Sequence, residues 1–284
     1  MSDLITDHLD TSPKTLSPHQ YGFRRNMSTE AALSRVTSEL QRTSYSGEYT
    51  IAISFDIEAA FDSILYQAII NSSVNFQVPE YLINYIHSYL HEQTVMFKGA
   101  THRPQEGCPQ GSVLGPLLWN IGYNPVLEVI SQLAHVTCFT DDTMVIITAS
   151  SILLLKEKFE KFCTIFTALL AIIAVKPNVS KTEILFLPGL RYHPELPVFT
   201  FQGQAIVSRH VIKYLGVYID SKFTFLPHCK YLETKCLKII NALKVLFANK
   251  YGYSNKSRKQ MLNGTAGAII KYIHNLLAHT SKEK

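Results

Sequence analysis

VTCFTDDTMVIIT, residues 136–148, contains two runs rich in β-branched residues, separated by Thr140, Asp141 and Asp142. Such runs favour strands, and the short polar break between them predicts a β-hairpin with adjacent carboxylates at its turn. Residues 51–55 form another apolar run, which predicts a buried strand ending at Asp56. If these strands pair, three carboxylates meet at one end of a sheet. Like charges this close repel each other, so the arrangement indicates a bound cation.

Magnesium is the cation that such a set of hard oxygen donors suits. Two magnesium ions would stabilise the attacking hydroxyl and the leaving oxygen of an in-line displacement at phosphorus. An isolated Asp-Asp pair is more often a solvated turn, so the surrounding sequence has to decide between a turn and a metal site.

The flanking sequence predicts further helices and loops. Residues 27–43 are typical of a helix capped at Ser28, and residues 152–173 of a long helix. A loop is expected over 104–111, followed by a helix over 112–131 that its two prolines should kink or break. A helix from Pro79 is expected to turn one stripe toward the core: Tyr81, Leu82, Tyr85, Ile86 and Leu90.

Strands and turns follow in the second half of the chain. A turn is expected at Pro177 and Asn178. Strands are expected over 94–97, 184–187, 198–201 and 212–219, and two basic helices, broken near Gly252, after residue 225. Because strands and helices interleave without strict βαβ order, the predicted fold class is α+β.

Composition limits the class of protein. The chain has 284 residues, 46% of them hydrophobic, which suffices for a core. Its five cysteines include no C-x-x-C pair, which favours a reducing compartment, nucleus or cytoplasm. The apolar stretch 164–175 is too short to span a bilayer, and the start of the chain does not resemble a signal peptide. We therefore expect an intracellular protein without a membrane span.

Charge is distributed unevenly. Residues 1–150 hold 7 Lys and Arg against 15 Asp and Glu, a net charge of −8, whereas residues 151–284 hold 20 against 7, a net charge of +13. A basic surface on the second part is consistent either with ordinary solvated lysines or with contact to a polyphosphate backbone. Composition alone does not separate the two.

Ordered motifs add a family resemblance. SFDIEAAFD (54–62), GCPQGS (107–112) with Gly115 and Pro116, and FTDD (139–142) resemble three catalytic motifs of reverse transcriptases from non-LTR retrotransposons. Three more blocks match in the same order: HQYGFR (19–24) with Ser28 and Thr29, KPN (176–178) with SKTE (180–183), and KYLGV (213–217). The details are most similar to elements of the jockey and R1 kind.

The resemblance implies a role for individual residues. Asp56, Asp141 and Asp142, with the backbone oxygen of Ile57, would bind two Mg²⁺ ions, for which Mn²⁺ is a possible substitute. Phe61 would lie beneath the incoming sugar and clash with a ribose 2′-hydroxyl, and Lys181 would protonate or neutralise the departing pyrophosphate. The other implied contacts are Gln110 and Gly111 with nucleotide and template, Arg24 with the template side, and the primer grip Tyr214, Leu215 and Gly216.

Each of these residues also has an ordinary interpretation. Phe61 could be core, Arg24 and Lys181 surface charges, the Gln110 loop a plain turn, and Tyr214 with Leu215 routine packing. The basic helices after residue 225 could follow a duplex backbone as a thumb does.

The expected fold is a right-hand polymerase palm, an antiparallel sheet with packed helices. We expect partial fingers at 1–50, the palm with embedded helical segments at 51–220, and a basic thumb-like segment at 221–284. Thr140 stands where the family usually has alanine. The basic finger residues for the triphosphate, an endonuclease domain and a Cys/His-rich segment have no counterpart here, which suggests a piece of a longer polyprotein or a decayed genomic copy.

The expected function is RNA-directed DNA polymerisation, a nucleotidyl transfer from dNTPs to a DNA primer on an RNA template. An inactive nucleic-acid-binding remnant is the alternative: intact carboxylates favour the enzyme, and the missing finger residues favour the remnant. A nuclease also uses clustered carboxylates, but it would need neither Phe61 nor the Pro-Gln-Gly loop.

Overall fold

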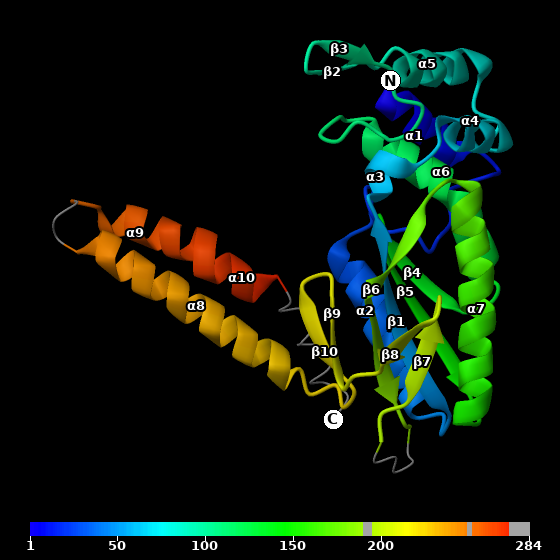
Figure 1. Ribbon diagram of the computed structural model, residues 1–284. Helices are drawn as coiled ribbons and strands as arrows, with labels where there is room; N and C mark the ends of the chain where they lie inside the picture. Colours follow the sequence, from blue (N-terminus) through cyan, green and yellow to red (C-terminus); the bar gives the residue numbers. More distant parts are fainter. Residues whose placement is uncertain (190–194, 249–251, 273–284) are drawn as a thin grey trace. The chain divides into compact units, whose positions relative to one another are not determined.

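The computed structural model describes residues 1–189, 195–248 and 252–272. The chain divides into two compact units, residues 1–209 and the residues from 210 onward. Each unit has its own secondary structure (Figure 1). Among the described residues, no helix combines the length and apolar character needed to cross a membrane.

An antiparallel four-stranded sheet forms the centre of the first unit, in the order β4-β5-β1-β6. Its strands are β1 (Tyr49–Glu58), β4 (His135–Phe139), β5 (Asp142–Ala149) and β6 (Lys176–Leu187). Consecutive residues 51–53 of β1 are all fully buried, because both faces of the sheet are covered. Figure 1 shows α2 and α7 on opposite sides of it. This mixed architecture confirms the predicted α+β class.

Seven helices and two small hairpins complete the described part of this unit. The helices are α1 (Ser2–Thr11), α2 (Thr29–Ser44), α3 (Ala60–Ser63), α4 (Tyr66–Asn75), α5 (Glu80–His91), α6 (Gly115–Ile130) and α7 (Ile152–Ile172). The hairpins are β2 (Val95–Phe97) with β3 (Ala100–His102), and β7 (Val198–Phe201) with β8 (Gln204–Val207). Helices α1, α3 and α4 and strands β3 and β8 were not predicted.

The helices begin where the sequence places caps. The Ser28 and Ser151 hydroxyls accept hydrogen bonds from the amides of Ala31 and Leu154 at the starts of α2 and α7. The predicted break in α6 is wrong, since the helix continues through Pro125. Pro116 lies in its first turn, where a missing N–H leaves no bond unmade.

Other predictions need correction. Pro177 and Asn178 do not form a turn but belong to β6, where they pair with Ile57 and Asp56. A proline is tolerated there because β6 is an edge strand. On α5, Leu82, Ile86 and Leu90 are buried as predicted, whereas Tyr81 and Tyr85 are exposed.

The second unit joins a β-hairpin to helices. It contains β9 (Val211–Tyr214), β10 (Val217–Asp220), α8 (Leu226–Phe247), α9 (Asn255–Leu262), a π-helical turn (Asn263–Gly267) and α10 (Ala268–Lys271). The single strand expected over 212–219 is therefore two strands, because Leu215 and Gly216 have positive φ angles and reverse the chain. The Asp220 carboxylate accepts hydrogen bonds from the amides of Lys222, Thr224 and Phe225, which fixes the entry to α8.

Residues 210–220 therefore group with the basic helices rather than with the sheet. The assignment of fingers, palm and thumb to stretches of this chain stays a prediction.

An aromatic cluster packs α7 against the sheet. The Phe55 ring of β1 lies 4.9 Å from Phe166 and 5.9 Å from Phe162, measured between ring centroids. Phe201 of β7 closes the cluster at 5.7 Å from Phe55. All four rings are buried, so this cluster holds together β1, α7 and the β7–β8 hairpin.

We expect Phe166→Ala to lower the free energy of unfolding by about 3–5 kcal/mol, because it opens a cavity in this cluster. The control is Leu153→Ala on the same helix, whose side chain is 71% exposed and should change stability by less than about 0.5 kcal/mol. Urea unfolding followed by circular dichroism measures both. Equal effects of the two substitutions would contradict the packing described here.

Candidate active site

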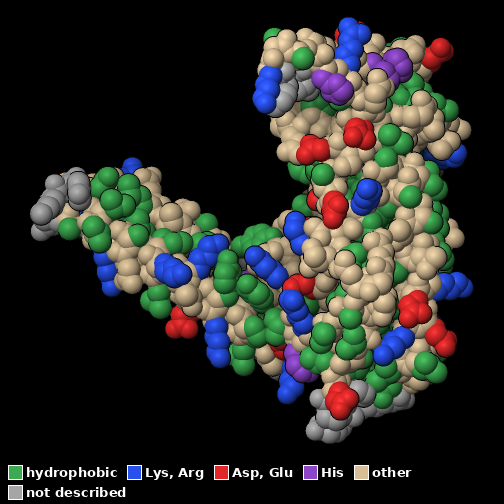
Figure 2. Space-filling view, in the orientation of Figure 1, with side chains coloured by type: hydrophobic (Ala, Val, Ile, Leu, Met, Phe, Trp, Pro, Cys, Tyr) green, Lys and Arg blue, Asp and Glu red, His purple; other side chains and the backbone are tan. Residues whose placement is uncertain are grey.

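Strand pairing brings the three predicted carboxylates together. Asp141 lies in the two-residue turn between β4 and β5, and Asp142 begins β5. β1 pairs with β5 up to Phe55 and Thr143, so Asp56 follows directly beside this turn. The condition for a shared site, that these distant strands be neighbours, is met. Figure 2 shows acidic side chains near α3, at this end of the sheet.

Crowding changes the acidity of two of these groups. Partial burial, followed by the charges of Asp141 and Asp56, raises the pKa of Asp142 from 3.8 to about 6. The pKa of Asp141 is raised as well, first by burial and then by Asp56, although Lys181 and a backbone hydrogen bond act against this. Ionisation of both Asp141 and Asp142 is therefore unfavourable unless a cation lies beside them.

A bulge in β6 places Lys181 against Asp56. The β1–β6 register shifts between Ser54, which pairs with Glu183, and Asp56, which pairs with Asn178. The Asn178 side-chain oxygen accepts hydrogen bonds from the Ser180 hydroxyl (2.7 Å) and the Lys181 amide (3.3 Å), which closes the bulge. As a result, the ammonium of Lys181 lies 3.3 Å from Asp56 Oδ2, although the lysine side chain is 68% exposed.

Asp56 Oδ2 is buried and accepts no hydrogen bond from the residues that the structure describes. A hard carboxylate oxygen that accepts no hydrogen bond and lies beside two further carboxylates fits a divalent ion in its donor chemistry. As they stand, no three acidic, histidine or cysteine side chains within the described ranges are close enough to share one ion. The Lys181 ammonium supplies positive charge here, and the carboxylates would have to draw together around an ion.

The Ile57 carbonyl also faces this region. Ile57 pairs with Pro177, which has no N–H, so these two residues cannot exchange hydrogen bonds. In an antiparallel ladder the peptide groups of Ile57 must then point away from β6, toward β5. The last β1–β5 pair joins Phe55 to Thr143, so this carbonyl lies beyond the ladder, on the side of the carboxylate turn.

Phe61 lies on α3, just after the strand that carries Asp56. Its half-buried ring is 5.5 Å from the ring of Trp119 on α6. The loop before α6 docks on the same short helix: the Cys108 amide donates to the Phe61 carbonyl and the Gly107 amide to that of Ile64. Gly107 has a φ of +95°, and a Cβ there would lie 3.0 Å from the Asp62 carbonyl oxygen. Glycine thus allows this close docking.

The rest of this loop is exposed beside α3. The side-chain amide of Gln110 donates a hydrogen bond of 2.9 Å to Asp62, and Gly111 has a φ of +78° with open space around its Cα. Both positions are open to a ligand, as the interpretation of a substrate-contacting loop requires.

Arg24 is held by the backbone of the loop before α2. Its guanidinium is half-buried and donates to the backbone carbonyls of Ser17 (2.6 Å) and Gln20 (3.3 Å), and burial lowers its pKa. These contacts make Arg24 a support for the loop before α2.

Tyr214, Leu215 and Gly216 form the end of the β9–β10 hairpin in the second unit. Tyr214 is buried, and the Leu215 carbonyl accepts a hydrogen bond from the Tyr272 hydroxyl at 3.0 Å. Figure 2 shows Lys and Arg side chains along α8 and over this hairpin.

Two residues that received no predicted role, Gln20 and Trp119, support the carboxylate turn. The Gln20 side chain and the Trp119 indole N–H both hydrogen-bond to the backbone of Thr140, the residue before Asp141. Gln20 belongs to the HQYGFR block, so a signal was present. Only the fold shows that this block lies against β4, where Gln20 and Cys138 form a parallel bridge.

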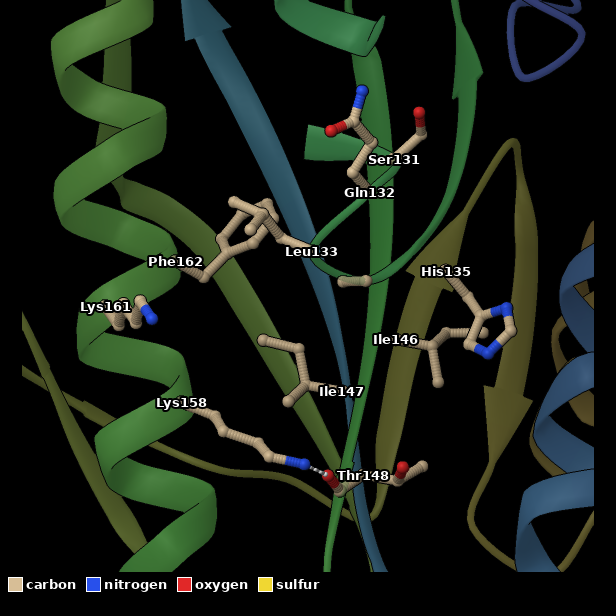
Figure 3. A pocket seen from close by; sticks show the side chains of 11 residues that line it. Ser131, Gln132, Leu133, His135, Ile146, Ile147, Thr148, Lys158, Lys161 and Phe162 are labelled. Carbon is tan, nitrogen blue, oxygen red and sulfur yellow. Dashed lines mark hydrogen bonds between the residues drawn. The ribbon is translucent and has the colours of Figure 1, made fainter. Parts of the chain in front are cut away.

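A separate cavity of about 460 Å³ lies toward the other end of β4 and β5 (Figure 3). Its lining includes His135, Ile147, Lys161 and Phe162, and Lys158, which donates a hydrogen bond to the Thr148 carbonyl. No carboxylate is among its lining residues, so it does not share the chemistry of the turn.

The family model described as "Reverse transcriptase (RNA-dependent DNA polymerase)" matches residues 1–219. The chain belongs to the reverse transcriptase family. Members of this family generally use divalent metal ions, which agrees with the donor chemistry of the carboxylate turn.

Relatives of this reverse transcriptase come from non-LTR mobile elements, as the motifs predicted. The chain is 24% identical over 262 residues to a retrovirus-related Pol polyprotein from the type-1 retrotransposable element R1 of Bradysia coprophila, covering 90% of this chain and 26% of that protein. It is 27% identical over 243 residues to the RNA-directed DNA polymerase from mobile element jockey of Drosophila melanogaster, covering 80% and 26%. The chain thus spans about a quarter of the length of these relatives.

Solved structures with a similar fold are telomerases. The telomerase of Candida tropicalis in complex with a TWJ fragment of telomeric RNA matches with a TM-score of 0.55 at 14% identity, covering 100% of this chain and 46% of that one. The apo form matches with a TM-score of 0.55 at 15% identity, covering 99% and 50%. At this level of identity the likeness concerns the fold, and it confirms the predicted right-hand polymerase architecture.

We expect the contribution of Asp142 to stability in metal-free buffer to fall as pH rises from about 4 to 6. Asp142 keeps a proton in the folded state over this window because its pKa is raised to about 6, whereas the unfolded chain has lost it. Asp141 acts in the same direction. Asp142→Asn should therefore stabilise the chain more at pH 7 than at pH 4, although water around the exposed Asp142 moderates the gain.

Urea unfolding of the parent chain and of Asp142→Asn at both pH values measures this difference. A stability difference independent of pH would show that Asp142 titrates normally in the folded chain.

Proposed function

We propose that this chain is the polymerase core of a reverse transcriptase, which transfers dNMPs from dNTPs to a primer 3′-hydroxyl on an RNA template with the aid of two Mg²⁺ ions. The observation that carries the proposal is the position of Asp56 beside the Asp141–Asp142 turn on neighbouring strands of an antiparallel sheet. Membership of the family supports the reaction type.

In this proposal the carboxylates of Asp56, Asp141 and Asp142, with the Ile57 carbonyl, hold the ions, and Mn²⁺ could replace Mg²⁺. Bound ions would stabilise charge on the attacking and leaving oxygens of the phosphoryl transfer. Lys181, displaced from Asp56 by the ions, has a long exposed side chain that can reach a departing pyrophosphate and neutralise or protonate it.

Other residues would bind substrates. Phe61 would lie under the deoxyribose and reject a 2′-hydroxyl, while Gln110 and Gly111 would contact nucleotide and template. Arg24, through the loop that it supports, would shape the template side. Tyr214, Leu215 and Gly216 would support the primer terminus, and the lysines of α8 would contact the duplex backbone. Further segments of a parent polyprotein are candidate partners.

The alternative is an inactive nucleic-acid-binding remnant. The observation that favours it is the Lys181–Asp56 ion pair together with carboxylates that, among the described residues, do not converge on one point. If these groups cannot rearrange around ions, template and primer could still bind without extension.

Primer extension on an RNA template with Mg²⁺ and four dNTPs tests the proposal. We expect the parent chain to extend the primer and the double variant Asp141→Asn, Asp142→Asn to lose all detectable extension, because hard anionic oxygens are replaced by neutral amides. A matched control, Glu157→Gln with Glu160→Gln on the exposed face of α7, removes the same charge and should keep activity. Template binding without extension by the parent would favour the remnant.

Replacement of Phe61 tests the sugar contact. We expect Phe61→Val to lower the preference for dNTPs over rNTPs at least about tenfold, because the smaller side chain leaves room for a 2′-hydroxyl. The ratio of kcat/KM for the two nucleotides measures this. Tyr49→Val, another half-buried aromatic packed on the core but far along β1 from Asp56, is the control and should keep the preference. Unchanged discrimination in Phe61→Val would make Phe61 a packing residue.

A further inference from the structure

Gln20 is 1% exposed, and its side-chain amide binds the backbone of Thr140 on both sides of that residue. Its Oε1 accepts hydrogen bonds from the amides of Thr140 (2.9 Å) and Gly22 (3.0 Å). Its Nε2 donates to the Thr140 carbonyl at 3.2 Å and approaches Cys138 Sγ at 3.5 Å. Both faces of the amide are therefore satisfied, and Gln20 grips the N–H and the C=O of the residue before Asp141.

Thr140 needs such support because of its backbone. Its φ of +63° is unusual for a β-branched residue and is unfavourable in isolation. Its carbonyl receives two more donors, the Trp119 indole N–H at 3.0 Å and the Cys138 thiol at 3.0 Å. A Cβ at Gly22 would lie 2.4 Å from both Thr140 N and Oγ1, so glycine there lets the two segments touch. The turn is thus held from three separate elements.

We propose that Gln20 is a positioning residue for the metal-binding carboxylates, and that Trp119 assists it. The β4–β5 hairpin is closed by the pair Phe139 and Asp142, so the strands do not need Gln20 in order to meet. Gln20 fixes the backbone conformation of Thr140, and this sets the direction in which the side chains of Asp141 and Asp142 point. This inference rests on the proposed function, because that function is what gives the carboxylates ions to bind.

Trp119 links the carboxylate turn to Phe61, the residue proposed to contact the nucleotide sugar. Its ring lies 5.5 Å from Phe61, while its N–H binds Thr140. One side chain therefore touches both the carboxylate turn and the residue proposed to exclude ribose. Loss of the indole N–H should affect the carboxylates while the ring contact to Phe61 persists.

The test is Mn²⁺ binding by the full chain, measured by isothermal titration calorimetry, together with thermal melting and the Mg²⁺ dependence of primer extension. Gln20→Met removes the amide at similar volume, and we expect Mn²⁺ affinity to fall about 10–100-fold, the usual effect of losing a group that orients metal ligands. Trp119→Phe should weaken affinity in the same direction, by less. Trp119→Phe keeps an aromatic ring at this position, so it tests the proposal even if Gln20→Met fails to fold.

The control is Asn124→Leu. Asn124 is a buried amide on α6 that accepts a hydrogen bond from the Ser17 amide, so it holds the same segment as Gln20 but makes no hydrogen bond to Thr140. We expect it to lower the melting temperature and to leave Mn²⁺ affinity unchanged. A purely structural role of Gln20 predicts the same behaviour for Gln20→Met, and that result would overturn the proposal.

The outcomes separate the two proposals. A parent chain that binds Mn²⁺ without extending a primer, while Gln20→Met has lost affinity, refutes the polymerase function and supports the positioning role. If the parent chain extends a primer, and Gln20→Met and Trp119→Phe have the same Mn²⁺ affinity and Mg²⁺ requirement as the parent, only the positioning role is refuted. A parent chain that neither binds Mn²⁺ nor extends overturns both.

Discussion

The pairing of β1 with β5 is the constraint on which the rest of this structure depends. Its register, with Phe55 opposite Thr143, sets Asp56 beside the turn that carries Asp141 and Asp142. A shift by one residue would turn Phe55 out of the aromatic cluster with Phe162 and Phe166 and would turn Asp56 to the opposite face. Burial of the phenylalanine and placement of the carboxylate are thus fixed by the same ladder, so the core and the carboxylate end of the sheet cannot be altered independently.

Features with a local physical cause could be predicted from the sequence. The β4–β5 hairpin, the caps at Ser28 and Ser151 and the long helix α7 follow from periodicity, turn chemistry and side-chain hydrogen bonds within a few residues. The meeting of the three carboxylates at one end of the sheet was also expected, although an isolated Asp-Asp pair is more often a solvated turn and the surrounding motifs were needed to favour a shared site.

Features that depend on tertiary contacts could not. Pro177 signals a turn locally, yet the edge position of β6 makes it harmless in a strand. The bulge that carries Lys181 to Asp56 exists only because Asp56 and Ser54 pair with residues five apart on β6. The grip of Gln20 on Thr140 joins residues 120 positions apart, and no local pattern encodes it. Propensity describes a segment alone, whereas these features arise where segments meet.

That long separation has a consequence for how the chain folds during synthesis. Gln20 leaves the ribosome 120 residues before Thr140, and residues 51–53 of β1 leave it 92–96 residues before their partners on β5. At about 5–20 residues per second, the delay for β1 is roughly 5–19 s. During that time the apolar residues 51–53 of a central strand have neither neighbour, because β5 and β6 are both still to come. Chaperone capture of the nascent chain is therefore most valuable between the emergence of β1 and that of β6.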